Sequence, residues 1–252
     1  MIDINLLSKK YGEQTVLDID LLSIPSGQTF GLVGNNGAGK TTLFNCLSRL
    51  YIPNQGDIRF QGKTILNSPP HQMAEIGIGR TFQNLALFKT MTVLDNIMVG
   101  GHARSRSDFV SNAFRLPWVS REENNLREAA WELIDYLELN DVAYQQVGGL
   151  PFGTQKRVEM GRALAAEPTL LLLDEPAGGL NHDEVNELGD LIKQVRDDRD
   201  ITVLLVEHHM SLVMSVSDQI VAIDFGRKIG EGTPEEIQQN QNVINAYLGT
   251  PE

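Results

Sequence analysis

Gly34-Asn35-Asn36-Gly37-Ala38-Gly39-Lys40-Thr41 is the stretch that decides the fold of this 252-residue chain. It fits G-x-x-x-x-G-K-[ST], the pattern of a loop that holds phosphate groups. Its glycines let the backbone curl so that successive N–H groups point inward at anionic oxygens. Lys40 adds a positive charge for the outer phosphates, and the Thr41 hydroxyl is a candidate Mg²⁺ ligand. The pattern therefore predicts that the chain binds a nucleotide.

The residues on either side support this prediction. The apolar run at residues 29–33 predicts a buried strand, and residues 41–50 predict a helix that ends before Pro53. The helix would then face the phosphates with the positive end of its dipole. A chance glycine-rich turn does not explain a loop placed between a strand and a helix in this way.

Composition restricts the class of protein. Hydrophobic residues make up 41% and charged residues 21%, as in globular domains. The net charge of -12 argues against a non-specific nucleic-acid binder, which needs a basic face. The single Cys46 provides no disulfide framework and fits a reducing cytoplasm. No basic and apolar leader opens the sequence, and no stretch reaches the roughly 18 apolar residues of a membrane span. We therefore expect any membrane role to depend on a partner.

A second motif places two acids after a hydrophobic run. Leucines at residues 170–173 predict a strand buried on both faces, and Asp174 and Glu175 follow at its carboxyl end, where α/β proteins bind ligands. Adjacent residues of a strand point in opposite directions. We expect one carboxylate to face Mg²⁺ and the next to face an attacking water.

Three single residues are weaker candidates. Tyr11 either stacks on a purine or is a half-exposed tyrosine at a strand end, and the sequence leaves both interpretations open. Gln83 either reaches Mg²⁺ or is a solvated loop residue, and without other support the second is favoured. His208, at the end of a predicted strand, contacts the γ-phosphate or has only a structural role.

The remaining pattern alternates strands with helices. Expected strands are residues 2–7 and 16–24 around a turn at 9–13, then 57–60, 201–206 and 219–224. The sequence from 92 to about 139 predicts two helices on either side of residues 100–119, with capping boxes at Thr92/Asp95 and Ser120/Glu123. Further helices are expected at 156–166, after a loop at 148–155, and at 183–197. This order predicts one α/β domain that carries a helical subdomain. Residues 100–119 form either a docking surface or a solvent-exposed connection.

Taken in order, these segments resemble the ATP-binding subunits of ABC transporters over nearly the whole chain. The resemblance implies an α/β P-loop NTPase fold: a RecA-like core with an antiparallel β subdomain, at about residues 1–84 and 165–252, and an inserted α-helical subdomain at 85–164. It implies ATP and Mg²⁺ as ligands, with Lys40, Glu175 and His208 as catalytic residues. The implied nucleotide-binding residues are Tyr11, Gly34, Asn35, Asn36, Gly37, Ala38, Gly39, Lys40, Thr41, Thr42, Gln83 and Gly153, and the implied metal ligands are Thr41, Gln83 and Asp174.

Finer features are similar to the LivG-type ATPases of branched-chain amino acid importers, namely residues 80–83, 91–96, 206–208 and 246–249, together with the insertion after Gly100. Importers of urea and short amides and lipopolysaccharide-exporting ATPases look similar, so the substrate stays open. The resemblance implies ATP hydrolysis coupled to transport on the cytoplasmic face of the inner membrane. Its implied partners are integral membrane permease subunits, a second ATPase subunit, identical or paralogous, in a head-to-tail dimer and, indirectly, a periplasmic or extracellular solute-binding protein.

The signature segment departs from the family pattern Leu-Ser-Gly-Gly-Gln. Pro151 takes the serine position, Phe152 that of the first glycine and Thr154 that of the glutamine. The family's serine donates a hydrogen bond to the γ-phosphate of the opposite subunit, which proline cannot do, so we expect a weaker ATP sandwich that still functions. In the loop at residues 178–181, Asn181 replaces the aspartate that is common in the family and removes one negative charge.

The sequence lacks the features that are typical of two alternative functions. A soluble ABC ATPase acting on DNA or ribosomes usually carries two cassettes, long coiled coils or basic surfaces, and none is evident. A regulatory GTPase needs a guanine-reading Asn-Lys-x-Asp segment, which the sequence does not contain.

Overall fold

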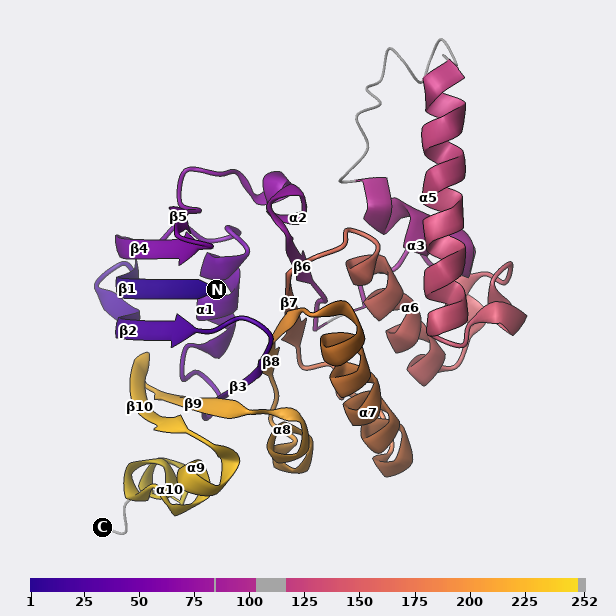
Figure 1. Cartoon of the computed structure of the whole chain (residues 1–252). Coiled ribbons are helices and arrows are strands. Elements are labelled where there is room, and N and C mark those ends of the chain that lie inside the picture. The colour runs from indigo at the N-terminus through magenta and orange to yellow at the C-terminus, as the bar shows by residue number, and fades with distance from the viewer. Residues whose placement is uncertain (84, 103–116, 249–252) are drawn as a thin grey trace. The chain divides into compact units, whose positions relative to one another are not determined.

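The computed structural model describes residues 1–83, 85–102 and 117–248 (Figure 1). The chain forms two compact units. The first combines residues 1–73 with the residues from 172 onward, and the second comprises residues 74–171. The second unit therefore includes the segment from Ala74 to Gln83, which precedes the predicted helical region.

An antiparallel sheet of four strands, in the order β2-β1-β4-β5, belongs to the first unit. Its strands are β1 (Ile2–Tyr11), β2 (Gln14–Ile24), β4 (Gln55–Phe60) and β5 (Lys63–Thr64). In β1, alternation buries Ile2 and Ile4 on one face. The strands run further than predicted, so the turn comprises only Gly12 and Glu13. Gly12 permits this tight hairpin because it adopts a φ of 59°, which side chains disfavour.

A second, mostly parallel sheet of the first unit carries the predicted phosphate loop. Its order within this unit is β10 (Arg227–Gly232), β9 (Gln219–Asp224), β3 (Thr29–Val33), β8 (Thr202–Val206) and β7 (Leu170–Asp174), and the unit boundary falls within β7. Strand β3 is parallel to β8 and β9. Every residue of β3, β7 and β8 is buried, which explains why their sequences are mostly apolar. The helices of this unit are α1 (Lys40–Leu47), α7 (His182–Arg199), α8 (Met210–Val216), α9 (Pro234–Gln239) and α10 (Gln241–Leu248).

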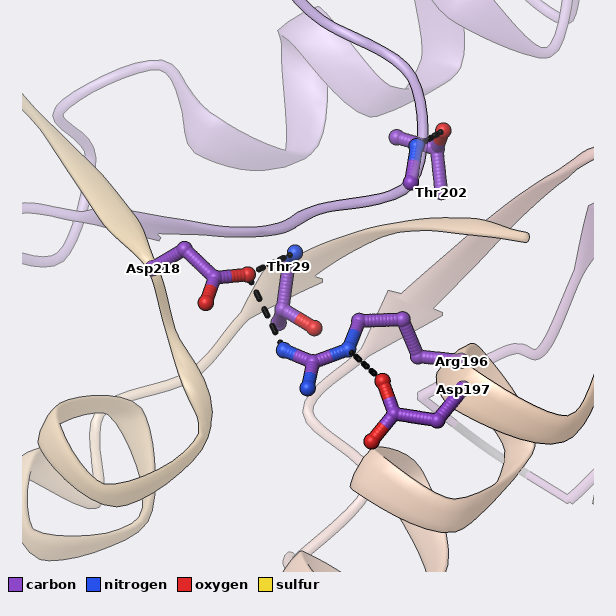
Figure 2. A network of polar contacts seen from close by, with 6 residues as sticks. Thr29, Arg196, Asp197, Thr202 and Asp218 are labelled. Atoms are coloured by element: carbon purple, nitrogen blue, oxygen red, sulfur yellow. Dashed lines mark hydrogen bonds and ion pairs between the residues drawn. The ribbon is translucent and has the colours of Figure 1, made fainter. Parts of the chain in front are cut away.

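A polar network anchors the start of β3 (Figure 2). The Asp218 carboxylate accepts the Thr29 N–H at 2.7 Å and a guanidinium N–H of Arg196 at 3.0 Å. Arg196 also donates to Asp197 at 2.7 Å. Nearby, the Thr202 hydroxyl accepts the Gly27 N–H at 2.9 Å. These bonds fix the strand that leads into the phosphate loop to α7 and to the start of β9.

The second unit holds α2 (Met73–Ile76), at whose first residue the unit boundary falls, β6 (Ile78–Arg80), α3 (Val93–Gly101), α5 (Pro117–Tyr136) and α6 (Phe152–Leu164). The predicted capping box of Thr92 and Asp95 is confirmed at the start of α3. The one predicted at Ser120 is wrong, because α5 begins at Pro117 and Ser120 lies inside it. Proline suits a first helical position, where no N–H partner is needed. Most of the insertion predicted at 100–119, including Arg104, Arg106, Phe114 and Arg115, lies outside the described residues.

Helix α6 begins earlier than the predicted residue 156. Pro151 occupies its N-cap with an extended backbone (φ -53°, ψ 150°), and the Gln155 N–H donates to the Pro151 carbonyl at 3.0 Å. Phe152, Gly153 and Thr154 therefore form the first helical turn, where the sequence predicts a loop. Proline fixes a φ that suits a helix start, so its presence extends the helix backwards.

One buried carboxylate joins α6 to the segment that carries Gln83. Glu159 accepts the Phe82 N–H at 3.1 Å and the Ala86 N–H, while Lys156 lies 3.9 Å away. Arg162 donates to the Ala86 carbonyl. Burial raises the pKa of the Glu159 carboxyl, and these hydrogen bonds and cations only partly oppose it. The two ends of the loop around Gln83 are thus held by a single side chain of α6.

Removing the Asp218 carboxylate should destabilise the fold. In Asp218→Ala the Thr29 N–H, in a fully buried residue, loses its acceptor, at a cost of about 1–3 kcal/mol. Urea denaturation measures the loss of unfolding free energy. Asp197→Ala is the matched control, since it removes only the exposed partner of Arg196 and should cost less than about 1 kcal/mol. Equal stability of the two variants would contradict the role given to this network.

The buried Glu159 should give the stability a distinctive pH dependence. Its pKa is raised in the folded state, so that state binds more protons than the unfolded chain between the two pKa values. The stabilising contribution is therefore fully present below the unfolded pKa and is lost as pH rises through the folded pKa. Relative to Glu159→Gln, the wild type should gain unfolding free energy as pH falls from neutral into the acidic range.

Denaturant titrations across that range make this comparison. Glu235→Gln, an exposed exchange on α9, is the control and should track the wild type. A difference between wild type and Glu159→Gln that stays constant with pH would contradict the effect of burial.

Candidate functional site

Close backbone approaches require glycine at two positions of the phosphate loop, Gly34 and Gly39. At Gly34, with a φ of 156°, a Cβ would lie 2.2 Å from the Ile223 carbonyl oxygen. At Gly39, with a φ of 106°, it would lie 2.8 Å from the Val16 carbonyl oxygen. Both approaches exclude any side chain. The loop is therefore pressed against β9 and β2, and this contact fixes its curl.

The phosphate loop and the N-terminus of α1 form a positively charged site that no side chain of the first turn of α1 neutralises. Gly39 is the N-cap of α1, no side chain caps this helix, and its first turn contains no acidic residue. Lys40 is buried, and its ammonium donates to the carbonyls of Gly34 at 2.7 Å and Asn35 at 3.0 Å. Thr41 is exposed. A helix N-terminus together with a curled lysine suits a polyphosphate.

Two carboxylates act on this ammonium. Burial lowers the pKa of Lys40, and the charges of Glu175 and Asp174 oppose that shift. The structure therefore brings the two predicted motifs together, although they are far apart in sequence. The oxygen ligands present, carboxylates and a hydroxyl, are of the kind that Mg²⁺ prefers, so the residues fit this metal.

The sequence predicts that Asp174 and Glu175 alternate along one strand, but only Asp174 belongs to the strand. Asp174, which is only 3% exposed, ends β7, whereas Glu175 lies beyond the strand with a φ of 48°. The Glu175 N–H donates to the Val206 carbonyl at 2.8 Å, so the ends of β7 and β8 lie side by side. The left-handed backbone, rather than the pleat, sets the direction of Glu175. Such a conformation costs a non-glycine residue about 1–3 kcal/mol and depends on its surroundings.

His208 follows a glutamate that sequence reasoning missed. The Glu207 side chain is fully buried, and one of its oxygens accepts the Ala177 N–H at 2.7 Å. The other accepts the N–H groups of His208 at 2.9 Å and His209 at 3.1 Å. The His208 side chain is 58% exposed, and its ring lies 4.9 Å from that of His209. The sequence offered one signal, an acid directly after the four apolar residues 203–206.

The other predicted nucleotide-binding residues differ in their surroundings. Tyr11 is 49% exposed, with Tyr51 edge-on at 6.0 Å between ring centroids and the Lys9 ammonium 5.3 Å from its ring. Asn35 donates through its side chain to the Ala246 carbonyl at 2.7 Å, which ties the loop to α10. Asn36 and Gly37 are exposed, whereas Ala38 is buried and Thr42 is half-buried.

Gln83 and Gly153 belong to the second unit. Gln83 is exposed and lies in the loop whose two ends Glu159 holds. Gly153 lies in the first turn of α6. Asn181 in the first unit caps α7. Its side chain accepts the Glu184 N–H at 3.0 Å, and the Glu184 carboxylate accepts the Asn181 N–H at 2.8 Å. Asparagine caps a helix as well as aspartate does, so the departure at this position preserves the local structure.

Comparisons with known proteins show which family the sequence belongs to. The ABC transporter family matches residues 17–178, and a branched-chain amino acid ATP-binding cassette transporter family matches residues 227–252. The chain is 40% identical to the branched-chain amino acid transport ATP-binding protein BraF of Pseudomonas aeruginosa, over 99% of this chain and 98% of that protein. It is 37% identical to the LivG protein of Salmonella typhimurium, with the same coverage.

Solved structures of ATP-binding cassettes from ABC transporters resemble this chain over nearly its whole length. A nucleotide-free ATP-binding cassette from an ABC transporter matches with a TM-score of 0.85 and 28% identity, over 99% of both chains. The ADP conformation of such a cassette matches with a TM-score of 0.83 and 28% identity, over 99% of this chain and 98% of that one. Among the described residues, no helix is both long enough and apolar enough to cross a membrane. The chain belongs to the ATP-binding subunits of the ABC transporter family and is an ATPase of that family.

Proposed function

We propose that this ATPase powers the import of branched-chain amino acids or related small polar solutes. The observation that carries the proposal is its likeness, over almost its entire length, to BraF and LivG, which are named as branched-chain amino acid transport proteins. The match of residues 227–252 to a family of the same name adds support from a separate part of the chain.

Each motif has a defined part in the proposed reaction. Lys40 and the amides of residues 34–42 hold the phosphates of ATP, and Tyr11 contacts the base. Thr41, Gln83 and Asp174 would hold Mg²⁺, which supplies charge neutralisation at the phosphate oxygens. Glu175 orients the attacking water and accepts its proton. His208, whose exposed side chain is open to a ligand, steadies the γ-phosphate. Catalysis of this kind depends on positioning and charge stabilisation.

A second ATPase subunit, identical or paralogous, would complete the site in a head-to-tail dimer. Gly153 and the N-terminus of α6 would then face the phosphates of the partner. Pro151 donates neither a hydroxyl nor an amide hydrogen bond there. A hydrogen bond to a charged group contributes about 1.5–3 kcal/mol, so we expect a weaker ATP-bound dimer than one with serine at this position.

The dimer would bind integral membrane permease subunits on the cytoplasmic face of the inner membrane. A solute-binding protein outside the membrane would deliver the solute to those subunits and would contact the ATPase only indirectly. The basis for this arrangement is the transport role named for the relatives, together with the absence of a membrane-spanning helix among the described residues.

Glu175→Gln tests the chemistry and the coupling together. General-base catalysis contributes typically about 10²–10⁴-fold, so the variant should lose at least about 100-fold in ATP turnover while it still binds ATP. Cells that express the chain with its permease and binding subunits should take up labelled leucine, and those with Glu175→Gln should not.

Glu235→Gln, on the exposed surface of α9, serves as the control and should hydrolyse ATP and support uptake at the wild-type rate. Wild-type hydrolysis by Glu175→Gln would refute the assigned base. Uptake of labelled urea in place of leucine would refute the assigned substrate class and leave the ATPase assignment intact.

A further inference from the structure

Glu207 is a buried charge that the proposed reaction does not use. Its side chain has no exposed surface, and within the part of the chain that the structure describes no lysine or arginine forms an ion pair with it. Its oxygens instead accept three backbone N–H groups, at 2.7, 2.9 and 3.1 Å. A buried carboxylate satisfied in this way needs all of these donors, because an unpaired charge is costly away from water.

The three donors come from the two segments that carry the proposed catalytic groups. Ala177 is two residues beyond Glu175, and His208 and His209 directly follow Glu207 itself. Next to these bonds, the Glu175 N–H donates to the Val206 carbonyl. Glu207 therefore fastens the turn of Glu175 to the start of the segment that bears His208. The left-handed backbone of Glu175 needs such support, because little else favours it in a residue with a side chain.

A metal site is the other interpretation of this cluster. Ligand atoms of Glu207, His208 and His209 all lie within 4.8 Å of one another. Both carboxylate oxygens already accept N–H groups, however, and the oxygen nearer to His208 accepts two of them. A metal ion on the oxygen nearer to His208 would displace one of these two N–H groups, because a carboxylate oxygen has only two lone pairs, so the geometry favours a positioning role.

We propose that Glu207 is a positioning residue of the ATPase site, one that holds Glu175 and His208 in a fixed relation at the ends of β7 and β8. The inference rests on the proposed roles of those two residues. Glu207 acts through the backbone and does not contact the nucleotide. A glutamine at this position keeps the size of the side chain but replaces one acceptor oxygen with an NH₂ group, which cannot accept the backbone N–H that faces it.

The test compares kcat and KM for ATP in the purified full chain. Glu207→Gln should lower kcat by about 10- to 100-fold, the scale expected for catalytic groups displaced by a fraction of an ångström to one ångström, with KM within about threefold of the wild type. Asp218→Asn is the matched control in the same unit, because its carboxylate also accepts a backbone N–H but lies at the amino-terminal end of β3. It should lower stability and leave kcat unchanged.

Two further variants keep the proposal falsifiable. Glu207→Asp retains two acceptor oxygens on a shorter stem and should have a kcat between those of the wild type and Glu207→Gln, which gives a second readout if Glu207→Gln does not fold. In a His208→Ala background, Glu207→Gln should lower kcat by a smaller factor than in the wild type, because part of its effect passes through His208.

A kcat within twofold of the wild type in both Glu207 variants would overturn the positioning role. The same factor in both backgrounds would overturn the part of the proposal that concerns His208. Wild-type turnover by His208→Ala alone would instead overturn the proposed role of His208. A loss of kcat in Glu207→Gln would then support positioning of Glu175 alone.

Discussion

The Lys40 ammonium is the charge around which the first unit is arranged. It is buried, it bonds to two carbonyls of its own loop, and the carboxylates of Asp174 and Glu175 partly offset the burial. The Lys40 ammonium therefore has hydrogen-bond acceptors even when no ligand is bound. These carbonyl oxygens are weaker acceptors than the charged oxygens of a phosphate. An arriving polyphosphate can therefore replace the carbonyls, while the two acids remain beside it in the positions that the proposed metal and water roles require.

The local motifs could be predicted from the sequence because their physics is local. Glycine at residues 34 and 39 is required by backbone conformation and close approach, and a short run of leucines before Asp174 is typical of a buried strand. Helix ends were less predictable. The sequence suggested a loop before residue 156, but Pro151 favours a helix start and extends α6 backwards to Phe152. Glu175 leaves the strand because of a left-handed turn, which no alternation pattern encodes.

The hydrogen-bond partners of the buried acids were not predictable, since they are far away in the chain. Glu159 meets Phe82, and Glu207 meets Ala177, across 77 and 30 positions of sequence respectively. In each case a carboxylate, usually a surface group, accepts backbone N–H groups of a loop that carries a proposed catalytic or metal-binding residue. Hydrogen bonds to a charged acceptor are stronger than neutral ones. This chain thus uses the same device in both of its units to hold a functional loop.

A crystal structure of the full chain with ATP and Mg²⁺ tests the central claim most directly. The account predicts that the Lys40 ammonium leaves the carbonyls of Gly34 and Asn35 and donates to the outer phosphates, with the metal bound between Thr41 and Asp174. Phosphates bound elsewhere, with Lys40 still on its two carbonyls, would contradict it.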